Sequence, residues 1–255
     1  MHRENLRSPV VALLVLAALA TSNSVRAQSA DEEKLAHAAD VLLGFTADED
    51  KSIPADLLQR ARGIAVIPSL VRGGFFIGGR RGRGVLAVRS PSGEWSNPAF
   101  ITLTGGSMGF QFGAEAADVV LVFGNDHSVK NMSDGKFTLG GDATAIAGPL
   151  GKRTTAAVTG KSEVYIYTHS KGLFAGAAFE GARLDVDEEG NALFYGNSAA
   201  ALASRSGTTP ASAARFLDTL AGVTGTTGLA PRGSASDHGN TAEEAIIYPI
   251  EEGPQ

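Results

Sequence analysis

Arginine is concentrated in one stretch of this 255-residue chain, residues 57–93, which contains no acidic residue. Within it, residues 73–84 read GGFFIGGRRGRG and include Arg80, Arg81 and Arg83. A guanidinium presents a planar fork of N–H donors that matches the oxygens of a phosphate group. Because side chains two residues apart on a strand share a face, Arg81 and Arg83 are expected to point the same way. The stretch therefore predicts an anion-binding strand.

Other residues are expected to extend this surface. Phe75 and Phe76 directly precede the arginines and could contact acyl chains, whereas the remaining cations come from later segments that the fold must bring close. These cations are Lys152, Arg153, Lys161 and Lys171. The alternative is a solvated strand edge that carries charge only to prevent pairing with other chains.

The composition excludes several other kinds of chemistry. The chain has no cysteine, so disulfides, thiolate catalysis and zinc–thiolate sites are excluded. Its histidines do not have the spacing of metal ligands, and the arginine stretch matches neither common nucleotide-binding glycine motif. A net charge of −5 argues against nucleic acid as a partner. We therefore predict no metal, no cofactor and no nucleic-acid partner.

One motif keeps an enzymatic alternative open. Residues 105–109 match G-x-S-x-G, in which Ser107 would be the nucleophile of an esterase. Asp126 and His169 are weak candidates for the Asp and His that such an enzyme needs later in the chain. That motif needs a strand before the serine and a helix after it. Residues 109–113 alternate between glycine or polar and aromatic residues, as in a strand. The sequence therefore favours a tight hairpin here, with a serine esterase as a remote alternative.

The hydrophobic pattern predicts helices first and strands afterwards. Residues 31–45 carry an apolar stripe with helical spacing, and a short helix is expected after Pro54. From residue 63 the pattern changes to about nine short strands, with the first ending at Pro68 and two separate strands at 75–79 and 84–89. Residues 187–191 are expected to form a turn. The prediction is an α+β fold with a mainly antiparallel, strongly curved or barrel-like sheet and N-terminal helices.

The two ends of the chain differ from this central region. Residues 1–27 combine arginines, an apolar run at 10–20 and small residues up to Ala27, which predicts a signal peptide cleaved near Ala27 and an exported, periplasmic or envelope protein. The central domain is predicted at 31–196, and a helical extension at 197–220. Residues 221–255 are predicted to be a flexible, low-complexity acidic tail.

A set of short motifs, in order along the chain, resembles the SYLF domain family. The motifs lie at residues 63–68, 78–86, 95–100, 105–107, 109–113, 117–118, 148–151, 167–176, 191 and 195–196. The resemblance implies a non-enzymatic lipid-binding module, since eukaryotic relatives bind phosphoinositides and yeast relatives bind actin. It also implies that residues 105–107 are a structural turn.

Together, these observations predict a non-enzymatic envelope module that binds anionic, phosphate-bearing lipid head groups through a basic sheet face. Because the first helix begins with acidic residues at 31–33, we assign the contact to the sheet and not to that helix. The alternative from a different class is a structural or protein-interaction module of the envelope.

Overall fold

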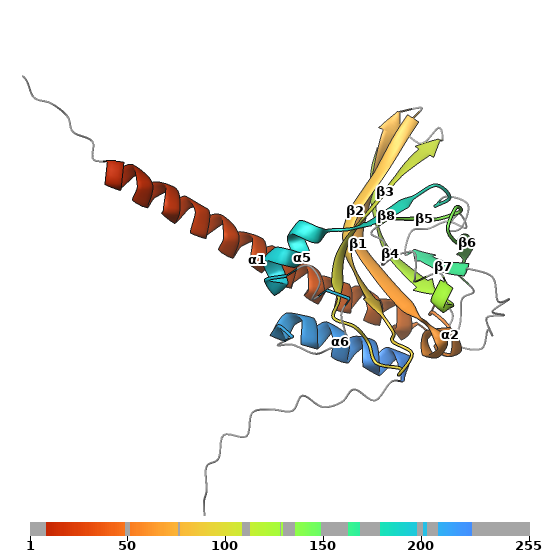
Figure 1. Cartoon of the computed structure of the whole chain (residues 1–255). Helices are drawn as coiled ribbons and strands as arrows, with labels where there is room; N and C mark the ends of the chain where they lie inside the picture. The colour runs from red at the N-terminus through yellow and green to blue at the C-terminus, as the bar shows by residue number, and fades with distance from the viewer. Residues whose placement is uncertain are drawn as a thin grey trace, which may run out of the picture.

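The computed structural model describes residues 9–48, 52–75, 77–108, 113–127, 129, 136–148, 163–168, 179–197, 201–202 and 209–225. Over these residues the chain forms an α+β fold in which one eight-stranded sheet curls into half a barrel (Figure 1). All neighbouring strands are antiparallel except one parallel pair. The structure therefore confirms the predicted fold class.

The described helices are α1 (Pro9–Ala47), α2 (Ala55–Arg60), α5 (Glu188–Tyr195) and α6 (Ala211–Thr224). The strands are β1 (Gly63–Phe75), β2 (Ile77–Val88), β3 (Ala99–Met108), β4 (Gly113–Phe123), β5 (Lys136–Thr138), β6 (Thr144–Ala147), β7 (Glu163–Thr168) and β8 (Arg183–Val186). They lie in the order β5-β8-β3-β2-β1-β4-β7-β6. One end of β1, β2 and β3 projects beyond the helices (Figure 1).

The sheet separates two hydrophobic cores. Side chains alternate along β1, so that Ile64 and Val66 join the core beneath the helices while Ala65 and Ile67 join the other. On the helix side, α1 and α6 lie along each other and both contribute buried side chains. On the opposite side, the curled sheet encloses its own core. Two buried faces explain why the central strands read as continuous apolar runs.

The helices follow the predicted apolar faces but extend beyond the predicted limits. Leu35, Leu42 and Phe45 of α1 are buried, as the stripe predicted. The helix begins earlier, at Pro9, and its N-terminal half runs away from the rest of the chain (Figure 1). Helix α6 continues to Thr224, into the predicted tail. Among the described residues, no helix combines the length and apolar character that a membrane-spanning segment requires.

Strand β1 does not end at Pro68, as the sequence predicted. It continues to Phe75 through an irregularity, where the pairing with β4 shifts between Ile67 and Leu70 and Ser69 adopts a φ of 52°. A carboxylate oxygen of Asp118 in β4 accepts the Ser69 N–H at 2.9 Å. Proline is tolerated at such a bulge because no ladder hydrogen bond is required of its missing N–H.

The two strands predicted at 75–79 and 84–89 belong mainly to one strand, β2. The intervening glycines do not break it; they let β1 approach closely. A Cβ atom at Gly84 would lie 2.2 Å from the Val66 carbonyl oxygen and 2.9 Å from the Ile67 Cα. At Gly82 it would meet the Ile67 and Leu70 side chains below 3 Å. These glycines therefore mark a contact between backbones.

The predicted turn at 187–191 is instead the start of helix α5. A carboxylate oxygen of Asp187 accepts the Gly190 N–H at 3.0 Å, and acidic residues fill the first turn, where the helix dipole favours negative charge. Gly196, with a φ of 76°, ends the helix in the left-handed conformation. The predictions for residues 109–112, 172–178 and 226–255 fall outside the described residues.

The contact at Gly84 generates a stability prediction. We expect Gly84→Ala to lower the free energy of unfolding by roughly 3 kcal/mol, since the new methyl group meets backbone atoms that cannot move aside. Gly106→Ala is the matched control, because a Cβ at that exposed β3 position would meet nothing within 4 Å. Urea denaturation of both variants measures the difference. Equal midpoints for the two variants would contradict the close contact.

Candidate anion-binding surface

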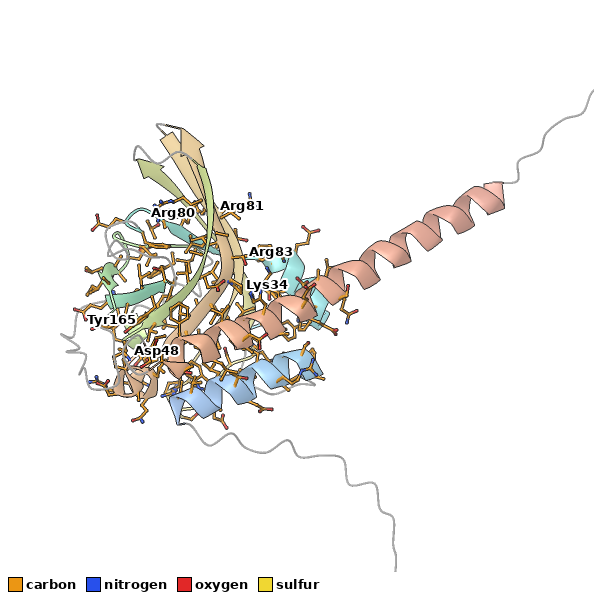
Figure 2. The ribbon with its side chains drawn as sticks, turned by 180° about the vertical axis from the view of Figure 1, so that it is seen from behind. Lys34, Asp48, Arg80, Arg81, Arg83 and Tyr165 are labelled. Carbon is orange, nitrogen blue, oxygen red and sulfur yellow. The ribbon has the colours of Figure 1, made fainter. Side chains whose placement is uncertain are left out.

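The structure places Arg80 and Arg81 on opposite faces of β2 (Figure 2). Arg80 lies on the side of the second core and is only 7% exposed. Its guanidinium carbon lies 4.8 Å from the centre of the Phe179 ring, and its Nη2 donates to the Gly106 carbonyl oxygen at 3.0 Å. Burial, and next the charge of Arg72, lower the pKa of Arg80. Arg80 therefore serves mainly as a packing residue.

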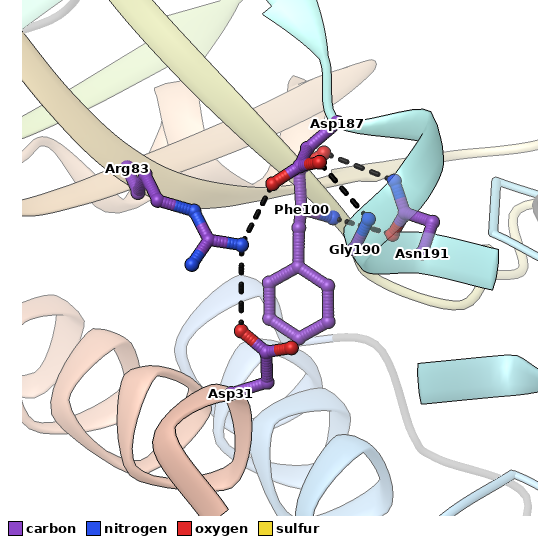
Figure 3. Close-up of polar contacts among 6 residues, drawn as sticks. All are labelled: Asp31, Arg83, Phe100, Asp187, Gly190 and Asn191. Carbon is purple, nitrogen blue, oxygen red and sulfur yellow. Dashed lines mark hydrogen bonds and ion pairs between the residues drawn. The ribbon is translucent and has the colours of Figure 1, made fainter. Parts of the chain in front are cut away.

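Arg83 shares the helix-bearing face with Arg81 but is engaged with carboxylates (Figure 3). Its Nη2 lies 2.7 Å from an Asp187 oxygen and 3.4 Å from an Asp31 oxygen. The Asp31 side chain is 7% exposed, and burial raises its pKa, an effect that the positive charge of Arg83 opposes. One guanidinium thus connects α1, β2 and the capping residue of α5.

Arg81 remains exposed near the projecting sheet end, defined here as residues 71–75, 77–81 and 104–108. It is paired in register with Val71, whose side chain is 52% exposed. The last register positions here are Phe75, Ile77 and Met108. This end of the sheet combines an exposed cation with apolar positions, which suits contact with a surface that is charged outside and apolar inside.

Of the other residues predicted for the surface, Phe75 lies within the projecting sheet end, as the last residue of β1. The rest lie outside the described residues: Phe76, Lys152, Arg153, Lys161 and Lys171. Their contribution stays a prediction.

The backbone around Ser107 differs from that of a nucleophile elbow. It lies in β3, paired in register with Gly78. Strand β3 ends at Met108 and β4 begins at Gly113, which leaves too few residues for the helix that a nucleophile elbow requires. Within the described part of the chain, no group of three histidine or carboxylate side chains is arranged to hold a metal ion.

Sequence reasoning missed a second gathering of arginines at the other end of the sheet. The antiparallel hairpin of β1 and β2 pairs Gly63 with Val88, so residues near the two ends of the acid-free stretch come together. The Arg89 N–H donates to the Arg62 carbonyl oxygen at 2.8 Å, and Arg60 ends the adjacent helix α2. The sequence signal for this second cluster was the acid-free stretch. Only the hairpin of β1 and β2 shows that the two ends of that stretch meet.

The described residues thus form an α+β domain with exposed arginines at both ends of its sheet. A family model described as Ysc84, Las17-binding protein actin regulator, matches residues 104–223. The chain is 40% identical over 157 residues to LAS seventeen-binding protein 3 of Saccharomyces cerevisiae, covering 60% of this chain and 34% of that protein. It is 38% identical over 149 residues to the human SH3 domain-containing YSC84-like protein 1, covering 57% of this chain and 43% of that protein.

The chain therefore contains a domain of the Ysc84, or SYLF, family, as its motifs predicted. The chain spans about a third of the length of the yeast relative and less than half of the length of the human one. The yeast relative is named as a binding protein, and the description of the family model adds the term actin regulator. No solved structure matches the chain.

Several motif residues of the family hold the fold together. Buried Asn191 accepts the Phe100 N–H at 2.8 Å and donates to the Phe100 carbonyl oxygen at 3.1 Å, which fixes α5 to β3 (Figure 3). The Tyr195 hydroxyl donates to the Pro98 carbonyl oxygen at 2.6 Å, and burial raises the pKa of Tyr195. These contacts identify the fold but do not specify a ligand.

The Arg83 ion pairs generate a pH-dependent prediction. Because burial raises the pKa of Asp31 above 3.8, folding favours its protonated form, and its contribution to stability falls as pH rises through the folded-state pKa. Arg83→Gln removes the opposing charge and makes this fall larger. We expect a loss of about 1–2 kcal/mol at neutral pH and a smaller loss in acid.

Denaturation curves of the wild type and variant across acid to neutral pH measure this difference. Arg183→Gln is the matched control, because its pair with Asp185 is more exposed on the carboxylate side and is expected to change stability by no more than about 0.5 kcal/mol. A loss for Arg83→Gln that stays constant with pH would show that Asp31 is not the group that depends on it.

Proposed function

We propose that this chain is a non-enzymatic binding module that contacts anionic, phosphate-bearing lipid head groups with its projecting sheet end. The observation that carries the proposal is the exposed pair of Arg81 and Val71 at an end of the sheet that the helices leave uncovered. A guanidinium binds phosphate oxygens, while a neighbouring apolar residue favours the acyl boundary.

The same end offers further groups for such a contact. Arg72 lies at the same end on the face opposite Arg81, with Arg80 and Glu115 as its cross-strand partners. Phe75, Ile77 and Met108 occupy its last register positions, and the predicted cations of later segments would add to it. Near an anionic membrane, each cation contributes about 1 kcal/mol, reduced by salt. Arg83 supports this surface by holding α1 and α5 against β2.

A protein-interaction module is the second candidate, and the names of the relatives favour it. The matching family model is described by binding to Las17 and by actin regulation. Either type of partner is consistent with a domain whose exposed surface, and not an enclosed pocket, carries the contact. A membrane assay with defined lipids separates the two candidates, since a protein-binding module would not select vesicles by head-group charge.

The exposed position of Arg81 generates the corresponding prediction. We expect Arg81→Glu to weaken binding to phosphatidylglycerol-containing vesicles about tenfold or more, because reversal removes one attraction and adds one repulsion. Vesicle flotation of the full chain measures the bound fraction. Arg215→Glu makes the same charge change at an exposed position of helix α6 and should leave binding nearly unchanged. Equal losses in both variants would point to net charge and not to the sheet end.

We also propose that the chain is exported and acts in the cell envelope. The support is the arginine-flanked apolar run and the small residues before Gln28. Mass spectrometry of the protein from a cell that exports it should find a mature N-terminus near Gln28. Recovery of uncleaved chain from the cytoplasm alone would contradict export.

A further inference from the structure

A pocket of about 450 Å³ lies at the end of the sheet opposite the projecting end. Its lining includes three arginines, Arg60, Arg62 and Arg89, together with a single carboxylate, that of Asp126. The amides of Gln59 and Asn125 also line it. Its volume is in the range of pockets that hold small ligands, and three of its four charged lining residues are cationic.

Three segments of the chain converge to build this pocket. Helix α2 ends at Arg60, and β1 begins three residues later, at Gly63. The Arg62 N–H donates to the Phe123 carbonyl oxygen at the end of β4, and the Arg89 N–H donates to the Arg62 carbonyl oxygen, each at 2.8 Å. The arginines are therefore carried on a backbone that is fixed by sheet hydrogen bonds, which favours a pre-formed site.

The three arginines differ in how firmly they are held. Arg89 is fixed, since its guanidinium carbon lies 4.5 Å from the centre of the Trp95 ring and its Nη1 donates to the Gln59 carbonyl oxygen. Arg60 pairs with Asp56, and Arg62 pairs with Asp126 at 3.2 Å, in solvent-exposed ion pairs. Exposed pairs are worth about 0–1 kcal/mol, so a more highly charged anion can replace them at small cost.

The charges in this pocket repel each other. Burial, and next the positive charge of Arg62, lower the pKa of Arg89. The charge of Arg62 therefore acts on Arg89 across the pocket, and charged groups perturbed in this way are concentrated at binding sites. An anion between them would relieve the repulsion.

We propose that this pocket binds a phosphate monoester, with Arg62 and Arg89 contacting the phosphate oxygens and Arg60 contributing at the rim. A dianionic phosphate offers three oxygens to guanidinium forks, and the pocket volume leaves room for a small polar group beside it. Gln59 and Asn125 supply amides for that group. This site is separate from the projecting sheet end, and the two can be tested independently.

The test uses Trp95, the only tryptophan of the chain, as a reporter beside Arg89. The full chain is titrated with glycerol 3-phosphate while Trp95 emission is recorded, and sodium chloride at matched ionic strength provides the reference. We expect a saturable change with the monoester and none with chloride. The double variant Arg60→Gln, Arg62→Gln should weaken binding at least about tenfold.

The matched control is the charge-reversal variant of the other site, Arg81→Glu, which should retain the affinity for the monoester. Displacement of the monoester by vesicles with phosphatidic acid, but not by phosphatidylcholine alone, would identify a lipid head group as its source. Binding without displacement would identify a free phosphate ester. An emission change that follows ionic strength alone, or an unaltered affinity in a folded double variant, overturns the proposal.

Discussion

The close approach of β1 and β2 at Gly82 and Gly84 is the constraint on which the rest of the structure depends. A side chain at Gly84 would meet the Val66 carbonyl oxygen, so the bulge of β1 can lie this close to β2 only where β2 carries glycine. Bulges increase local twist and bend the strand. The bend lets the sheet curl around a core of its own while its other face receives the helices. Glycine at these positions loses more backbone entropy on folding than other residues do, but it permits the strong curvature of the sheet.

The curl also determines which charges are available to a partner. Arg80 faces the enclosed core, Arg83 faces two carboxylates, and Arg81 faces solvent, although the three lie within four positions of one strand. Their roles differ because the strand alternates its faces and because the helices cover only part of its length. A compact basic motif in sequence is therefore distributed in space, and its binding capacity depends on the single positions that remain exposed.

The sequence predicted the features that depend on local pattern. The apolar stripe of α1 and the alternation in the central strands follow from helix and strand geometry, and the fold class follows from their order. Two features were mispredicted for non-local reasons. The bulge at Ser69 depends on Asp118, and the continuity of β2 depends on contact with β1. Each requires a partner that is distant in sequence. The start of α5 is different, because Asp187 caps it locally through the Gly190 N–H.

The same distinction limits what family motifs reveal about ligands. Asp118, Asn191 and Tyr195 lie within the motifs, and each makes a hydrogen bond that joins segments of the fold. Such residues identify the domain because they are needed to build it. Arg60, Arg62 and Arg89 lie outside the motifs, and the fold places them together at a pocket. If members of this family differ in what they bind, the differences are expected at positions such as Arg60 and Arg62, whose exposed ion pairs contribute little to folding.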